Sequence, residues 1–183
     1  MSKRKLQYPT ELPNWKGVSF TKDQKRVRKE NSWFDDYKVD RIFQFLKYLR
    51  NNPHPTIVTV LDCRRISPFE YSYFMPLMAR LSNSEAELVD LYTSGEHNSD
   101  YRKANHKRIL YLKKKHPKLF QVLQKIESWG TYLDLHDGNL MRDRYGNYKV
   151  IDLEGFGFSH YSYDDLVSSI TVRRYSPTHR PTG

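Results

Sequence analysis

The pattern of hydrophobic and polar positions changes at residue 32. Residues 1–31 are polar and basic and contain two prolines and one glycine, so they predict an arm with at most one short strand, "GVSF". From Ser32 onward, "SWFDDYKVDRIFQFLKYLRNN" repeats apolar residues at helical spacing. Ser32 is a suitable helix cap and Pro53 a suitable stop. The predicted apolar face consists of Phe34, Tyr37, Ile42, Phe45, Leu46 and Leu49.

Two short runs of β-branched and aromatic residues follow this helix. "TIVTVLDC", residues 56–63, is typical of a strand, and "YSYFMPLM", residues 71–78, predicts an antiparallel partner for it. Pro76 has no N–H to donate, which indicates a strand end or an edge position.

The rest of the chain is mostly helical in pattern. Three helices are predicted, over residues 83–92, 104–115 and 117–129. Pro117 opens the last of them at its first turn, and Gly130 closes it. "YKVIDL", residues 148–153, predicts one more strand, and residues 173–183 predict a mobile tail. This order of elements indicates the α+β class.

Basic residues outnumber acidic ones by 31 to 21, which gives a net charge of +10. The excess is concentrated in residues 22–29 and 102–118, and such clusters attract nucleic acid, nucleotides or acidic proteins. Solvated helix faces would produce the same pattern, so both interpretations stay open. No apolar stretch approaches the length of a membrane span or of a signal peptide. We therefore expect a soluble, cytoplasmic protein without a membrane partner.

Candidate chemistry is concentrated in "YLDLHDGNLMRDRYGNYKVIDLEGF", residues 132–156. Asp134, Asn139 and Asp152 offer oxygen atoms of the kind that Mg²⁺ prefers, and a carboxylate can also accept a proton from a hydroxyl. Residues 137–139, "DGN", predict a tight turn that holds Asn139 beside the Asp134 loop, and Gly138 is able to take a positive φ there. A hairpin around Gly146 would then bring Asp152 back beside the Asp134 loop.

This spacing resembles the catalytic loop and metal-binding Asp of protein kinases. "DLHDGN" and "IDLE" are closer to the branch that contains aminoglycoside and choline phosphotransferases, in which a His occupies the position of His136. Over about residues 56–158, "TIVTVLDCRRIS" and "LFQVLQKIESWGTYLDLHDGNLM" are similar to the early protein kinases of short-tailed lytic bacteriophages.

The resemblance implies a reduced kinase-like fold, a set of cofactors and a role for each site residue. The cofactors would be ATP and Mg²⁺, and the location would be the host cytoplasm. Asp134 would orient or deprotonate the acceptor hydroxyl, and His136 would face the transferred phosphate. Asn139, Asp152 and Glu154 would hold the metal. The adenine would contact the backbone of a hinge at residues 75–78, including Met75, Leu77 and Met78, and Lys16 would stand for the strand lysine.

The resemblance also divides the chain. Residues 1–31 would be a basic arm, 32–78 a truncated N-lobe, 79–172 a C-lobe that makes up most of the fold, and 173–183 a tail. The sequence has no Gly-rich phosphate loop and no evident Lys–Glu pair.

Three functions remain open on these grounds. The first is Mg-ATP-dependent phosphorylation of Ser or Thr on host proteins. The second is an inactive pseudokinase that binds or inhibits a host protein or nucleic acid through its basic surface. The third, which the basic composition disfavours, is a small-molecule phosphotransferase.

Overall fold

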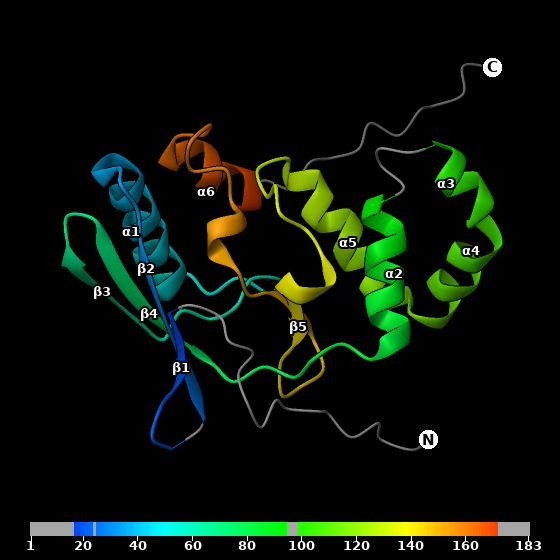
Figure 1. The fold of residues 1–183 in the computed structure, drawn as a ribbon, viewed down its shortest axis with the longest axis horizontal. Coiled ribbons are helices and arrows are strands. Elements are labelled where there is room, and N and C mark those ends of the chain that lie inside the picture. The colour runs from blue at the N-terminus through cyan, green and yellow to red at the C-terminus, as the bar shows by residue number, and fades with distance from the viewer. Residues whose placement is uncertain (1–16, 24, 95–98, 172–183) are drawn as a thin grey trace.

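The computed structural model describes residues 17–23, 25–94 and 99–171 (Figure 1). Lys16 and the expected tail at 173–183 lie outside these ranges. The described chain combines helices with small antiparallel sheets, which confirms the α+β class. Figure 1 shows the larger sheet and helix α1 at one end of the molecule, and helices α2 to α5 at the other.

The larger sheet has four antiparallel strands in the order β1-β2-β4-β3. β1 (Val18–Phe20) pairs with β2 (Arg26–Ser32), and β3 (Asp62–Ser67) pairs with β4 (Glu70–Pro76). Pairing between β2 and β4 joins the two halves into one sheet. The prediction of a strand at 71–78 is therefore confirmed for most of its length.

The prediction of an arm with at most one short strand over residues 1–31 is wrong where β2 runs. β2 lies between two other strands, so its backbone is paired on both sides although six of its seven residues are polar. Because side chains alternate between the two faces of a strand, Val27 and Lys29 share one face. Opposite them on β4 lie Met75 and Tyr73. The pairing partners, and not the composition of β2, make this segment a strand.

Helix α1 (Asp36–Asn51) begins later than predicted. Asp35, and not Ser32, caps it by accepting hydrogen bonds from the backbone N–H groups of Tyr37 and Lys38. Ser32 belongs to β2 instead. The buried face of α1 consists of Val39, Ile42, Phe45, Leu46 and Leu49.

The predicted strand at 56–63 is also wrong in its position. Ile57 makes a parallel bridge to Val150, with Val58 N–H donating to the Val150 carbonyl at 2.8 Å. Ile57, Val58 and Val60 are therefore buried, whereas Leu61 is exposed, and β3 starts only at Asp62. A short apolar run predicts burial better than it predicts which neighbour the backbone will bond.

The helices after β4 are α2 (Asn83–Ser94), α3 (Ser99–Ala104), α4 (His106–Lys115), α5 (Pro117–Trp129) and α6 (Tyr163–Thr171). Of these helices, α2, α4 and α5 follow the sequence prediction, whereas α3 and α6 were not predicted. Pro117 stands at the start of α5, and Gly130 ends it in the left-handed conformation with a φ of 66°, as predicted. None of the helices in the described ranges is long and apolar enough to cross a membrane.

A two-stranded hairpin connects the candidate loop to the rest of the fold. β5 (Leu140–Arg142) pairs with β6 (Tyr148–Val150) around Gly146, whose φ of 84° confirms the predicted turn. The 3₁₀-helices η1 (Asp137–Asn139) and η2 (Leu153–Gly155) flank the hairpin. The candidate site residues therefore lie directly before and after this short hairpin.

Candidate functional site

A pocket of about 270 Å³ lies between the larger sheet and the loop that carries η1. The sheet contributes one residue from each of β1, β2 and β4, and the remainder come from the loop and the end of the hairpin. Its lining residues are Val18, Lys29, Met75, His136, Gly138, Asn139, Ile151 and Asp152. Segments far apart in the chain thus meet around one space.

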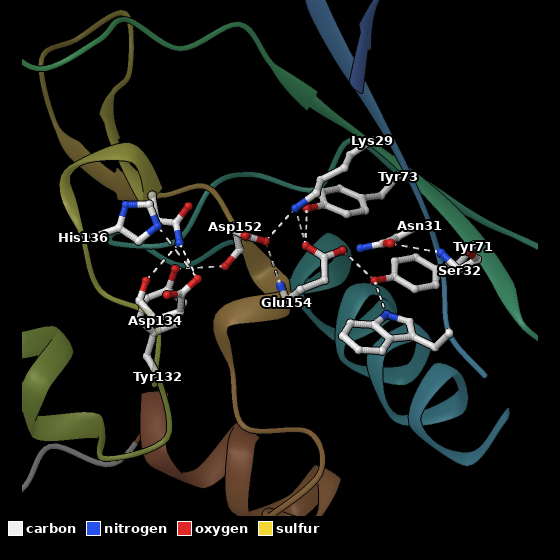
Figure 2. A network of polar contacts seen from close by, with 12 residues as sticks. Lys29, Asn31, Ser32, Tyr71, Tyr73, Tyr132, Asp134, His136, Asp152 and Glu154 are labelled. Atoms are coloured by element: carbon white, nitrogen blue, oxygen red, sulfur yellow. Dashed lines mark hydrogen bonds and ion pairs between the residues drawn. The ribbon is translucent and has the colours of Figure 1, made fainter. Parts of the chain in front are cut away.

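Lys29 is the cation of this pocket. Its Nζ lies 2.6 Å from Asp152 Oδ1 and 2.5 Å from Glu154 Oε2, and its side chain is only 15% exposed (Figure 2). Burial disfavours the charged amine, but the negative charges of Glu154 and Asp152 outweigh burial and raise the pKa of Lys29. The ammonium therefore stays charged at neutral pH.

Asp152 and Glu154 form one unit at the start of η2. Asp152 Oδ1 accepts the Glu154 backbone N–H at 3.1 Å as well as the Lys29 ammonium. Burial opposes ionisation of Asp152, but the bonds from Glu154 and the charge of Lys29 prevail and lower its pKa. Burial and the neighbouring Asp152 raise the pKa of Glu154. Asp152 is thus the more readily ionised member of the pair.

Asp134 and Asn139 are held together by the loop. Asn139 Nδ2 donates to both the backbone carbonyl and Oδ2 of Asp134, each at 2.9 Å. The Ile151 N–H donates to the Asn139 carbonyl at 3.0 Å, which ties the loop to the residue before Asp152. Asn139 is 7% exposed, whereas the Asp134 side chain is 59% exposed. Asp134 is therefore the member of this pair that is open to another molecule.

His136 caps η1 at the edge of the pocket. Its Nδ1 accepts the Gly138 N–H at 3.1 Å, and its Nε2 lies 3.9 Å from Asp134 Oδ2. Gly138 does not adopt the positive φ that a glycine permits, since the positive-φ glycines in the described ranges lie elsewhere. The missing Cβ leaves room for the His136 ring, because an added Cβ would lie 2.8 Å from His136 Cε1. Gly138 therefore sets the position of the His136 ring.

The predicted hinge residues have three different environments. Met75 lines the pocket, whereas Met78 is buried in the core. The Leu77 N–H donates to the Lys25 carbonyl at 3.0 Å, so a ligand that used this donor would have to displace that bond. Of the three residues, Met75 alone has the placement expected for a contact with a bound base.

The oxygen atoms of the site suit a cation that is shared with a phosphate chain. No cluster of three or more His, Cys, Asp or Glu side chains of metal-binding geometry occurs within residues 17–23, 25–94 and 99–171. Asp152 Oδ2 has no hydrogen-bond partner in those ranges, and Asn139 Oδ1 belongs to an amide that Asp134 orients. Mg²⁺ commonly takes one or two protein oxygens and completes its shell with phosphates and water. Asp152 and Asn139 fit that kind of site.

Glu154 does not lie where a metal ligand was expected. Its Oε1 accepts from the Tyr71 hydroxyl at 2.5 Å, and its Oε2 faces Lys29 and, at 3.5 Å, the Tyr73 hydroxyl. Both oxygens are therefore occupied by donors on the sheet side. The contacts make Glu154 a partner of Lys29.

Sequence reasoning missed Lys29, Tyr71 and Tyr73. The usable signal was the alternation of Val27 and Lys29 with outward-facing polar residues in "RVRKENS". The high charge of the segment hid this strand pattern.

No protein-family model matches the chain, and no curated protein matches it significantly.

Proposed function

We propose that the chain is a reduced protein kinase-like phosphotransferase that uses Mg-ATP to phosphorylate Ser or Thr hydroxyls of host proteins. The proposal is carried by one observation: Lys29 faces Asp152 at 2.6 Å in a pocket that also contains Asn139 and His136. A cation and a carboxylate that face each other in one pocket are what a phosphate chain with its magnesium requires. Lys29 takes the part that was expected of Lys16.

The pocket residues then divide into three groups. Val18, Met75 and Ile151 form the apolar part that would receive the base. Lys29 would contact phosphate oxygens, while Asp152 and Asn139 would hold Mg²⁺, which when bound neutralises charge on those oxygens.

The loop would position the acceptor. Asp134 is exposed and oriented by Asn139, so it can accept a hydrogen bond from an incoming hydroxyl. His136 lines the pocket and its Nε2 lies 3.9 Å from Asp134 Oδ2, so the ring would lie beside the path of the transferred phosphoryl group. Positioning and electrostatics supply most of the catalysis in this reaction, so a small site is sufficient.

A second candidate is a pseudokinase that binds a partner without turnover. Three contacts favour it: Asp152 and Glu154 already pair with Lys29, and the Leu77 N–H is already bonded to Lys25. Binding of ATP would have to compete with these bonds. The chain would then act as a docking or inhibitory module.

A labelling experiment separates the two candidate functions. Labelled ATP, magnesium and host lysate are added to the wild type and to the variants Asp134→Asn and Asp152→Asn. If the chain is a kinase, the wild type labels an acceptor. Asp134→Asn then keeps the Mg-ATP-induced rise in Tm, but its labelling rate falls roughly 10²- to 10⁴-fold. Asp152→Asn loses both the rise in Tm and the labelling. Asp164→Asn, an exposed carboxylate on α6, is the matched control. A wild type without labelling and without a Tm shift supports the pseudokinase, and labelling that survives both variants is contamination.

The basic surface that is free to bind a partner is smaller than the two clusters of basic residues in the sequence suggest. In the cluster at 22–29, Lys29 points into the pocket, Arg26 pairs with Asp23 and Arg28 pairs with Glu30. In the cluster at 102–118, the lysines on α4 and at the start of α5 are mostly exposed. We propose α4 as the surface for an acidic protein or nucleic acid.

A further inference from the structure

The carboxylate of Glu154 is enclosed by three donors from the sheet. Lys29 Nζ lies 2.5 Å from Oε2, the Tyr71 hydroxyl donates to Oε1 at 2.5 Å, and the Tyr73 hydroxyl lies 3.5 Å from Oε2. Only 8% of the Glu154 side chain is exposed. Figure 2 shows the carboxylate facing Lys29 and the two tyrosines of β4, away from Asp134. Such a buried carboxylate holds its partners in a narrow range of positions.

The acids of α1 are occupied elsewhere. Asp35 and Asp36 accept backbone N–H groups at the start of the helix. Asp40 is paired with Arg65. None of these three acids pairs with Lys29 in the part of the chain that the structure describes. The lysine therefore takes its orientation from η2 and not from the helix.

We infer that Glu154 is a positioning residue that holds the Lys29 ammonium in place for a nucleotide phosphate. This inference rests on the proposed function and adds to it a specific partner for the cation. Because Glu154 is only two residues beyond Asp152, one turn of 3₁₀-helix sets both the lysine and the carboxylate assigned to the metal. Movement of η2 would displace the cation and the metal-side oxygen together.

Tyr71 holds the carboxylate at Oε1, and Tyr73 contacts Oε2, the oxygen that also faces Lys29. Tyr71 and Tyr73 are fully buried, so Phe can replace either with little change in volume. Glu154→Asp keeps the charge but withdraws the carboxylate by about 1.5 Å, one C–C bond. These variants separate charge from position.

The decisive experiment is a double-mutant cycle on Mg-ATP affinity. Kd is measured for the wild type, Lys29→Met, Glu154→Gln and the double variant, together with KM and kcat for turnover. If Glu154 acts through Lys29, Glu154→Gln weakens binding roughly tenfold in the wild type and less than about twofold in Lys29→Met. KM for ATP should rise more than kcat falls.

A second set of variants tests the same inference if the Glu154→Gln protein fails to fold. Tyr71→Phe removes one bond to Glu154 and should weaken Mg-ATP binding roughly threefold, again only while Lys29 is present. Glu127→Gln is the matched control, because Glu127 accepts from the Tyr92 hydroxyl outside the pocket lining. It should leave Kd unchanged.

The outcomes are distinguishable. Equal losses for Glu154→Gln or Tyr71→Phe with and without Lys29 would overturn the positioning role and leave the proposed function standing. A folded wild type that binds no Mg-ATP would overturn the proposed function, and the inference with it. A non-additive cycle supports both.

Discussion

Lys29 and Glu154 are 125 residues apart in the chain, and their charged groups are 2.5 Å apart in the structure. The contact joins the central part of the sheet to the segment that follows the hairpin. It therefore links the two walls of the pocket directly. A change in how the sheet sits on the loop would therefore alter this contact.

Gly138→Ala should reduce turnover and leave Mg-ATP affinity nearly unchanged. The new Cβ would lie 2.8 Å from His136 Cε1, so the ring must shift, which disturbs its bond from the residue 138 N–H. We expect a roughly tenfold fall in kcat, measured by steady-state phosphorylation. Gly146→Ala is the control, because it strains the hairpin turn at φ 84° outside the pocket lining. Equal losses of turnover in the two variants would contradict the role given to Gly138.

Stability should rise with pH between about 4 and 6.5 because of His54. Burial disfavours its charged form, Lys125 and Lys149 repel it, and together they lower its pKa from 6.5 to about 4. The neutral ring accepts the Thr56 N–H at 3.1 Å. The unfolded chain binds the proton more tightly, so this contribution is complete above 6.5 and is lost as the pH falls towards 4.

The measurement for His54 is urea unfolding at pH 4.5 and pH 7. After allowance for solvent screening at this partly exposed site, the difference assigned to His54 should be about 1 to 2 kcal/mol. His54→Gln should remove that part of the difference. His106→Gln, at an exposed histidine on α4, should leave it intact. An unchanged pH dependence in His54→Gln would show that other groups produce it.

Glu85→Ala should destabilise the fold by about 2 to 4 kcal/mol. Glu85 is buried; it accepts the Ser82 N–H and hydroxyl at 2.7 Å each, which satisfies these two donors at the start of α2. It also accepts the Tyr148 hydroxyl at 2.7 Å, which connects α2 to the hairpin.

Glu87→Ala on the same helix is the matched control. Its carboxylate pairs with Arg108 at the surface, where such bridges contribute about 0 to 1 kcal/mol. Chemical denaturation of both variants gives the comparison. Similar losses from the two glutamates would contradict the capping and bridging role of Glu85.

Charge reversal on α4 should weaken binding of polyanions. Lys107, Lys114 and Lys115 are exposed on this helix, and each phosphate contact that is lost should reduce the slope of log K against log salt by about 1. Anisotropy with short single-stranded DNA and with an acidic peptide, over a series of salt concentrations, identifies the preferred ligand. Arg26→Glu, in the other cluster, should have little effect. If Arg26→Glu weakens binding equally, binding depends on the net charge of the protein and not on α4.

The loop residues could be predicted from the sequence because their geometry is local. Asp134 and Asn139 lie within one short loop, and a hairpin of ordinary turn chemistry returns the chain to Asp152. Spacing alone therefore carried the information. The same holds for α5, whose Pro117 and Gly130 mark its ends.

The sheet side of the pocket could not be predicted in this way. β2 is mostly polar, and the partners of Lys29 stand 123 and 125 residues later in the chain. Its strand character comes from pairing on both sides, which local propensity does not encode. The functional position of Glu154 was likewise hidden, because it depends on two tyrosine hydroxyls of β4.

The interior position of β2 has a consequence for shortened versions of the chain. A version that starts at residue 33 keeps every helix described above but removes both β1 and β2. The backbone groups of β4 that now bond to β2 would then face solvent along the strand's whole length. Exposed edges of this kind recruit other chains, so trimming the basic N-terminal region for solubility would produce a protein that aggregates.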